Sequence, residues 1–218
     1  MGSNRIKTRT LTGVALFTAI VVILQLVGAF IRFGPFSISL VLVPIVVGAA
    51  LYGAGAGAWL GLVFGLVVLL SGDAAAFLAV NPFGTIITVL AKGALAGWCA
   101  GAVYHWLEDK NRYLAVIAAA IVCPVVNTGI FLLGCKLFFM ETINGWAQSA
   151  GYPNAGAFII LGMIGLNFLV EMGTDIVLSP VVLRLIRIGK NEQLDPARLS
   201  EAEEYDPTTA DDHKSVQA

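Results

Sequence analysis

Apolar residues run along this chain in long stretches that short polar segments separate. A helical membrane span needs about 20 apolar residues, with 17 to 25 usual. Continuous apolar runs predict helices, whereas a spanning barrel shows alternation in segments of about ten residues. The sequence therefore predicts an all-α integral membrane protein with six transmembrane helices. The predicted spans are residues 11–31, 37–53, 56–72, 82–106, 113–139 and 157–186.

The composition agrees with a membrane protein. Of the 218 residues, 58% are hydrophobic and only 12% are charged, and the mean hydropathy is +0.85. Ordinary soluble domains carry about 25% charged residues. The basic start of the first stretch resembles that of a signal peptide, but its apolar run is too long and no soluble domain follows. We therefore interpret it as the first span.

Lysine and arginine set the expected orientation. Basic residues gather before the first span, between the fourth and fifth, and after the sixth, so with six spans all three groups lie on one face. The positive-inside rule makes that face cytoplasmic, which places both termini in the cytoplasm. These residues are Arg5, Lys7, Arg9, His105, Lys110, Arg112, Arg184, Arg187 and Lys190.

Charge also divides the chain into three parts. We expect a basic cytoplasmic N-terminus at residues 1–10, a six-helix substrate-binding domain at 11–190, and an acidic cytoplasmic tail at 191–218. The tail has a net charge of −6, few aromatic residues and two prolines, so it is predicted to be disordered. A solubilising role is favoured over a regulatory one.

Small residues recur at every fourth position in three spans. Such rows allow helix backbones to approach closely. For the two glycine rows we favour packing within this protein. The rows are Gly53, Gly57, Gly61 and Gly65 in the third span, Gly93, Gly97 and Gly101 in the fourth, and the shorter pair Ala15 and Ala19 in the first.

Polar residues that lie deep in apolar spans are the candidate chemistry. A charge at bilayer depth costs about 2.5 to 3.5 kcal/mol on insertion scales, so it usually faces a partner or a cavity. At 1.5 Å per residue, Lys92 lies about 15 Å from the start of its span, and Asn127 lies about halfway along the next. The set is Lys92, Asn127, Asn167, Glu171 and Asp175.

These residues predict a site for a small polar ligand. Asn167, Glu171 and Asp175 stack on one helix face, with Asp175 toward the cytoplasmic half. An ammonium and two amides suit a molecule that carries a carboxylate or amides. Asn81, in the outer turn before Pro82, joins the candidate ligand residues. The alternative is an ion pair between Lys92 and Glu171 that specifies helix packing.

The loop Met140–Gly156 has an amphipathic character, with Trp146, Tyr152 and Pro153. Membrane anchoring and a lid over the site explain it equally well. Asn81-Pro82 predicts a helix start, because proline suits the first helical turn.

Other function classes find little support. The chain has no HExxH or GxSxG motif and no cysteine/histidine metal cluster, so we expect no enzyme, no metal and no cofactor. Its glycine-rich run lacks the lysine of a P-loop, so ATP would have to be used by another subunit. Pro124 has no counterpart in the second span, which argues against inverted repeats with broken helices. No basic, aromatic-interleaved surface indicates nucleic-acid binding.

Several motifs together resemble the S components of energy-coupling factor (ECF) vitamin transporters. They are the six helices with both ends inside, the opening Ala15-Leu-Phe-Thr-Ala19, the stretch Val43-Pro-Ile…Leu51-Tyr-Gly-Ala-Gly-Ala-Gly, and Asn127-Thr-Gly-Ile-Phe. The resemblance covers about residues 11–187. It implies a substrate-capture subunit in a prokaryotic plasma membrane, whose partners are a transmembrane T subunit and two ATPases.

The resemblance also implies roles for residues. The Ala15/Ala19 pair matches the family's docking motif for the T subunit, and the family's site lies toward the outer half of helices 4 to 6. The segment from Asn127 to Lys136-Leu-Phe-Phe looks most like pantothenate-type members, with folate and riboflavin as alternatives. Glu171 departs from a simple anion site, and either pairs with Lys92 or meets a cationic group of the substrate. A lipid-modifying membrane enzyme and a noncatalytic scaffold remain rival hypotheses.

Overall fold

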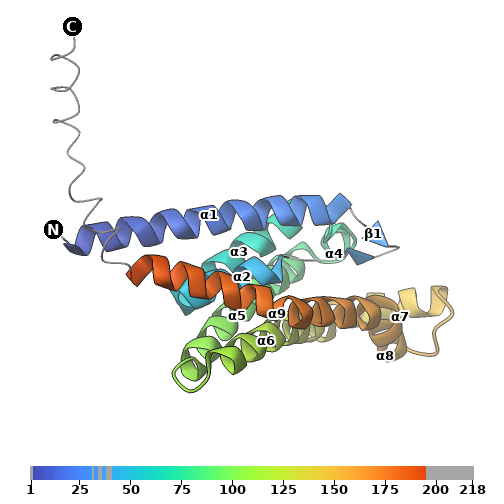
Figure 1. The fold of residues 1–218 in the computed structure, drawn as a ribbon. Coiled ribbons are helices and arrows are strands. Elements are labelled where there is room, and N and C mark those ends of the chain that lie inside the picture. Colours follow the sequence, from blue (N-terminus) through green and yellow to red (C-terminus); the bar gives the residue numbers. More distant parts are fainter. Residues whose placement is uncertain (1, 31, 34–35, 38–40, 195–218) are drawn as a thin grey trace, which may run out of the picture.

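The computed structural model describes residues 2–30, 32–33, 36–37 and 41–194 as a bundle of helices (Figure 1). Some side chains at both ends of the first helix and along the last one, including Asn167 and Glu171, lie outside this description. The elements are α1 (Gly2–Phe30), β1 (Arg32–Phe33), β2 (Phe36–Ser37), α2 (Leu42–Tyr52), α3 (Ala54–Leu70), α4 (Ala75–Val80), α5 (Pro82–Leu107), α6 (Arg112–Gly134), the π-helix η1 (Cys135–Phe139), α7 (Met140–Ser149), α8 (Ala155–Ala157), the π-helix η2 (Phe158–Ile164) and α9 (Gly165–Leu194).

The prediction of an all-helical membrane protein is confirmed in its main part. Apart from two antiparallel two-residue strands, the described regular elements are helices. Among the residues that the structure describes, three helical stretches are long and apolar enough to cross a bilayer: Thr10–Gly28, Pro82–Leu107 and Arg112–Ser149. Helices α2 and α3 are apolar but shorter, with 11 and 17 residues. The count of six spans and the cytoplasmic placement of both termini stay predictions.

The predicted boundaries agree with the observed helices for α3 and α5, but α1 begins at Gly2 rather than at 11, α2 begins at Leu42 rather than at 37, and α9 ends at Leu194 rather than at 186. Asn81 is the N-cap of α5 and Pro82 its first residue, as expected. Pro124 lies inside α6 without ending the helix. At the other end of the chain, α9 continues to Leu194, and residues 195–218, most of the predicted acidic tail, lie outside the described residues.

Glycine rows hold α3 and α5 together at the centre of the bundle. A Cβ atom placed on Gly57 or Gly61 would collide with the backbone carbonyl of Gly97 or Gly93, and the reverse also holds. The two backbones therefore touch directly, which is the kind of contact that small residues permit in membranes. The prediction that these rows pack within the protein is confirmed except at Gly53, which has no atom within 4 Å of a Cβ position. Gly53, with φ of 97°, makes the turn that separates α2 from α3.

Helix α1 lies along one edge of the bundle (Figure 1). It packs through residues spaced four apart: Gly13 and Phe17 contact Tyr52 at the end of α2, while Val21 and Gln25 are buried. Only 11% of the residues in its apolar window are buried inside the protein, against 39% in that of α5. Most of the α1 surface is therefore open to lipid or to another protein.

Two buried clusters of apolar side chains form the interior. The larger one joins α1, α2, α3, α5, α6 and α9. The smaller one contains Phe139, Ile143 and Ile159 and joins η1, α7 and η2. Because Phe77 of α4 and Phe131 of α6 pack against this second cluster, it gathers the segments between α3 and α5 and between α6 and α9 at one end of the bundle.

Candidate functional site

Lys92 lies between two aromatic rings in the middle of α5. Its Nζ atom is 5.7 Å from the ring centroid of Phe64 in α3 and 5.5 Å from that of Phe131 in α6. The contact of Gly61 with Gly93 brings Phe64 to the level of Lys92. Aromatic faces attract a cation by about 0.5 to 2 kcal/mol, most strongly where water is excluded. The two rings thus hold the ammonium group of a half-buried lysine where α3, α5 and α6 meet.

Four aromatic side chains form a cluster next to Lys92. Phe77 meets Phe131, Phe139 and Trp146 edge to face, with ring centroids 5.6, 5.0 and 5.5 Å apart. We call these four residues the outer aromatic cluster. It joins α4, which ends just before the predicted outer turn at Asn81, and α7, which lies in the predicted loop Met140–Gly156, to the Phe131 ring that faces Lys92. The contact of Trp146 with Phe77 favours the lid interpretation of the loop Met140–Gly156 over anchoring alone.

Two buried polar groups lie on the facing sides of α5 and α6. Asn127 is 7% exposed and Thr88 is 5% exposed. Among the residues that the structure describes, Asn127 Oδ1 and Thr88 Oγ1 have no hydrogen-bond partner. Most buried polar atoms have such a partner, and an unsatisfied one costs about 1 to 3 kcal/mol. Both positions can therefore accept a hydrogen bond from a bound molecule or water.

The helices around these groups have an unusual local geometry. Thr88 packs against Gly134, the last residue of α6 before the π-helix η1. A second π-helix, η2, precedes α9. Such π segments are frequent at functional sites, because an extra residue in the turn changes where the following side chains point. Here η1 carries Phe139 into the outer aromatic cluster.

The other predicted ligand residues fall into three groups. Asn81 caps α5, its Oδ1 accepting from the backbone N–H of Gly84 at 2.9 Å. Asp175 is 2% exposed in α9, and Ser179 donates to its backbone oxygen at 2.9 Å. Asn167 and Glu171 belong to α9, but their side chains lie outside the described residues. The ion pair of Lys92 with Glu171 and the ligand role of Asn81 stay predictions.

Ala15 and Ala19 are both exposed on α1. They lie on the face opposite to the packed residues Gly13, Phe17 and Val21. Nothing in the described part of the chain covers them, in contrast to the glycines of α3 and α5. The predicted docking pair is therefore open to a partner.

Sequence reasoning missed the aromatic side chains around Lys92. Phe64, Phe77 and Phe131 are apolar residues in apolar helices, and only the folded arrangement distinguishes them from lipid-facing phenylalanines such as Phe83. Thr88 was also missed. Its spacing of four residues from Lys92 was the available signal, because residues i and i+4 share a helix face.

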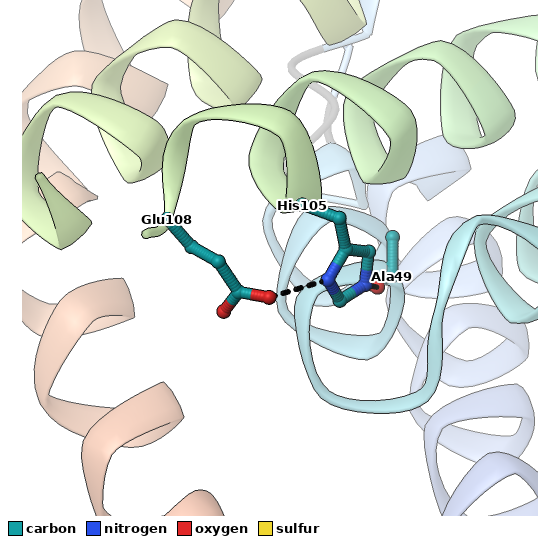
Figure 2. Close-up of polar contacts among 3 residues, drawn as sticks. All are labelled: Ala49, His105 and Glu108. Atoms are coloured by element: carbon teal, nitrogen blue, oxygen red, sulfur yellow. Dashed lines mark hydrogen bonds and ion pairs between the residues drawn. The ribbon is translucent and has the colours of Figure 1, made fainter. Parts of the chain in front are cut away.

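A polar contact at the opposite end of α5 ties it to α2. Figure 2 shows the His105 ring between the Glu108 carboxylate and the backbone of Ala49, at 2.7 Å from Glu108 Oε1 and 3.2 Å from the Ala49 oxygen. An imidazolium can donate to both acceptors, whereas a neutral ring can donate to one. The described residues contain no group of three or more His, Cys, Asp or Glu that could hold a metal ion. Because the His105 ring reaches from α5 to the backbone of α2, we assign this contact to helix packing.

Comparison with protein families gives a match over most of the chain. The family described as "ECF transporter, substrate-specific component" matches residues 9–183. The chain belongs to this family. No curated protein and no solved structure gave a significant match.

Family membership decides the general class of function. As an ECF S component, the protein is a membrane transport subunit that binds a substrate, and its family is one of transporter components rather than enzymes. Membership also implies a small-molecule substrate and partnership with the T subunit and the ATPases of the transporter. The resemblance inferred from the sequence motifs is thereby confirmed.

Proposed function

We propose that this S component captures a small vitamin with a carboxylate, pantothenate in the first place, and delivers it through a T subunit and two ATPases. The observation that carries the proposal is the ammonium of Lys92, which lies between Phe64 and Phe131 within the bundle. Charged residues at membrane depth commonly mark substrate sites. The Lys92 ammonium has three donors, so besides its contacts within the protein it can bind a ligand carboxylate through a charge-assisted hydrogen bond.

Neighbouring groups narrow the ligand chemistry. The Oδ1 of Asn127, which has no hydrogen-bond partner among the described residues, can accept from a ligand N–H or O–H. The rings of the outer aromatic cluster suit an apolar body. Pantothenate combines a carboxylate, an amide, hydroxyls and a branched aliphatic part, which fits this set. Folate and riboflavin are the alternative ligands, and Asn81, Asn167 and Glu171 are further candidate contacts.

Helix α1 is the proposed docking element. The exposed Ala15 and Ala19 would let a helix of the T subunit approach the α1 backbone closely. In this proposal the protein lies in a prokaryotic plasma membrane with six spans and both termini in the cytoplasm. The outer aromatic cluster then faces the external medium, from which the vitamin enters.

Calorimetric titration of the purified full chain with pantothenate tests the ligand and the site together. We expect binding by the unaltered protein and a loss of about 10- to 100-fold in affinity for Lys92→Met, because a hydrogen bond to a charged group contributes about 1.5 to 3 kcal/mol. Lys110→Met is the matched control, since Lys110 Nζ also lies 5.5 Å from an aromatic centroid, that of Trp106, at the other end of α5.

Three outcomes separate the parts of this proposal. If folate or riboflavin binds in place of pantothenate, the substrate is reassigned and the site stands. If Lys92→Met binds the vitamin as tightly as the unaltered protein, the site is wrong. Should Lys92→Met fail to fold, Asn127→Leu tests the same site from α6.

A further inference from the structure

Gln25 is a buried polar residue on a helix that is otherwise largely exposed. Its side chain is 4% exposed, and its Nε2 atom donates to Asp73 Oδ2 at 2.8 Å. The Ser71 hydroxyl donates to the same oxygen at 3.1 Å. Burying an amide is unfavourable unless it is hydrogen-bonded, so this contact fixes the position of α1 relative to the segment after α3.

Asp73 connects this contact to the outer aromatic cluster. It lies in the turn between α3 and α4, and α4 begins two residues later and carries Phe77. Phe77 meets Phe131 with ring centroids 5.6 Å apart, and Phe131 lies 5.5 Å from Lys92 Nζ. A continuous series of contacts therefore runs from Lys92 to α1. A ligand beside Lys92 and Phe131 would therefore lie at one end of this series, and α1 lies at the other.

The exposed face of α1 lies at the other end of this series. Gln25 belongs to the packed stripe of α1, together with Phe17 and Val21, and Ala15 and Ala19 lie on the opposite face of the same continuous helix. A second side-chain hydrogen bond, from Trp59 Nε1 to Thr18 Oγ1 at 3.2 Å, also joins α1 to α3. It is exposed and lies away from α4, so it offers a natural control.

We propose that the Gln25–Asp73 hydrogen bond couples the Lys92 site to the docking face of α1, so that ligand occupancy changes how α1 is presented to the T subunit. This inference rests on the proposed function for its two endpoints. The coupling is carried by the packed and hydrogen-bonded side chains that connect the Lys92 site with α1. Coupling of this kind is reciprocal, so T-subunit binding to α1 must change the ligand affinity by the same factor by which the ligand changes T-subunit binding.

Hydrogen–deuterium exchange of the full chain in nanodiscs tests the coupling without any ligand. We expect Gln25→Leu to raise the exchange of α4 amides by about tenfold, the effect of losing one hydrogen bond to a charged group. Phe77→Leu should raise exchange in the outer turns of α1 around Gln25. Thr18→Val removes the hydrogen bond from Trp59 to α1 and should leave α4 unchanged.

Each result of these exchange measurements either supports or overturns the coupling. If Gln25→Leu leaves α4 exchange as in the unaltered protein, or if Thr18→Val loosens α4 equally, the coupling through Asp73 is overturned. If Gln25→Leu does not fold, Phe77→Leu tests the same series of contacts from α4, and unchanged exchange in α1 then contradicts the proposal.

A second experiment adds pantothenate. The ligand should slow exchange in both α4 and α1 only in protein that keeps the hydrogen bond between Gln25 and Asp73. Failure of pantothenate to bind would overturn the proposed ligand while the ligand-free result still decides the coupling.

Discussion

Helices α5 and α1 carry the same small-residue pattern with opposite outcomes. In α5, Gly93 and Gly97 press against the backbone of α3. In α1, Ala15 and Ala19 are exposed, and the helix packs through a different stripe. Small residues at four-residue spacing therefore indicate a close contact with another helix, but the pattern does not distinguish a helix of the same chain from a helix of another subunit. The unpaired row is the one that another subunit can use.

Position in the bundle explains the difference. Helix α5 contacts α3 on one side and α6 on another, so its small residues are enclosed while Lys92 and Thr88 face the interior. Helix α1 contacts the bundle along one stripe only. The glycine rows therefore contribute to stability, and in the proposed function the polar side of α5 captures the ligand while the exposed side of α1 serves assembly.

The largest expected effect on folding comes from filling the glycine contact. Gly61→Ala would place a methyl group against the carbonyl of Gly93, and overpacking of this kind costs about 1 to 3 kcal/mol. We expect the unfolding midpoint in detergent to fall accordingly. Gly55→Ala in the same helix is the control, because no atom lies within 4 Å of the new methyl group. Equal unfolding midpoints of the two variants would contradict the view that enclosed glycines contribute more to stability than exposed ones.

A smaller effect is expected from the ring that faces Lys92. Phe131→Leu keeps an apolar side chain but removes the aromatic face, which we expect to weaken pantothenate binding about fivefold. Phe83→Leu provides the matched control on α5, because Phe83 is 71% exposed. Titration calorimetry measures both. An unchanged affinity in Phe131→Leu would show that the aromatic ring beside Lys92 does not contribute to ligand binding.

The sequence predicted much of the helical framework for identifiable physical reasons. Hydropathy located the helices, Asn81-Pro82 gave a boundary because both residues favour a helix start, and the glycine rows indicated close packing. Lys92 and Asn127 stood out because polar groups in apolar spans are rare. The sequence also contained Gln25, a polar residue in the first span, but its partner Asp73 is 48 positions away along the chain, and only the fold brings the two together.

Other features had no sequence signal. Phe64, Phe77 and Phe131 are ordinary residues for apolar helices, and their arrangement around Lys92 depends on how α3, α4 and α6 pack. The π-helices η1 and η2 have no distinctive residue pattern. Asn81 shows a different difficulty. An asparagine suits both ligand binding and helix capping, so its residue type alone does not separate the two roles; in the structure its side chain caps α5.

The most direct test of the account replaces both exposed alanines of α1. The double variant Ala15→Leu with Ala19→Leu is co-expressed with the T subunit and the ATPases, and its recovery in the purified complex is compared with its vitamin binding in isolation. The account predicts that assembly is lost while the affinity for the vitamin and the unfolding midpoint stay within error, because neither alanine packs against its own bundle. Full assembly of the double variant would contradict α1 as the docking helix, and loss of vitamin binding with assembly intact would contradict the separation of the two faces.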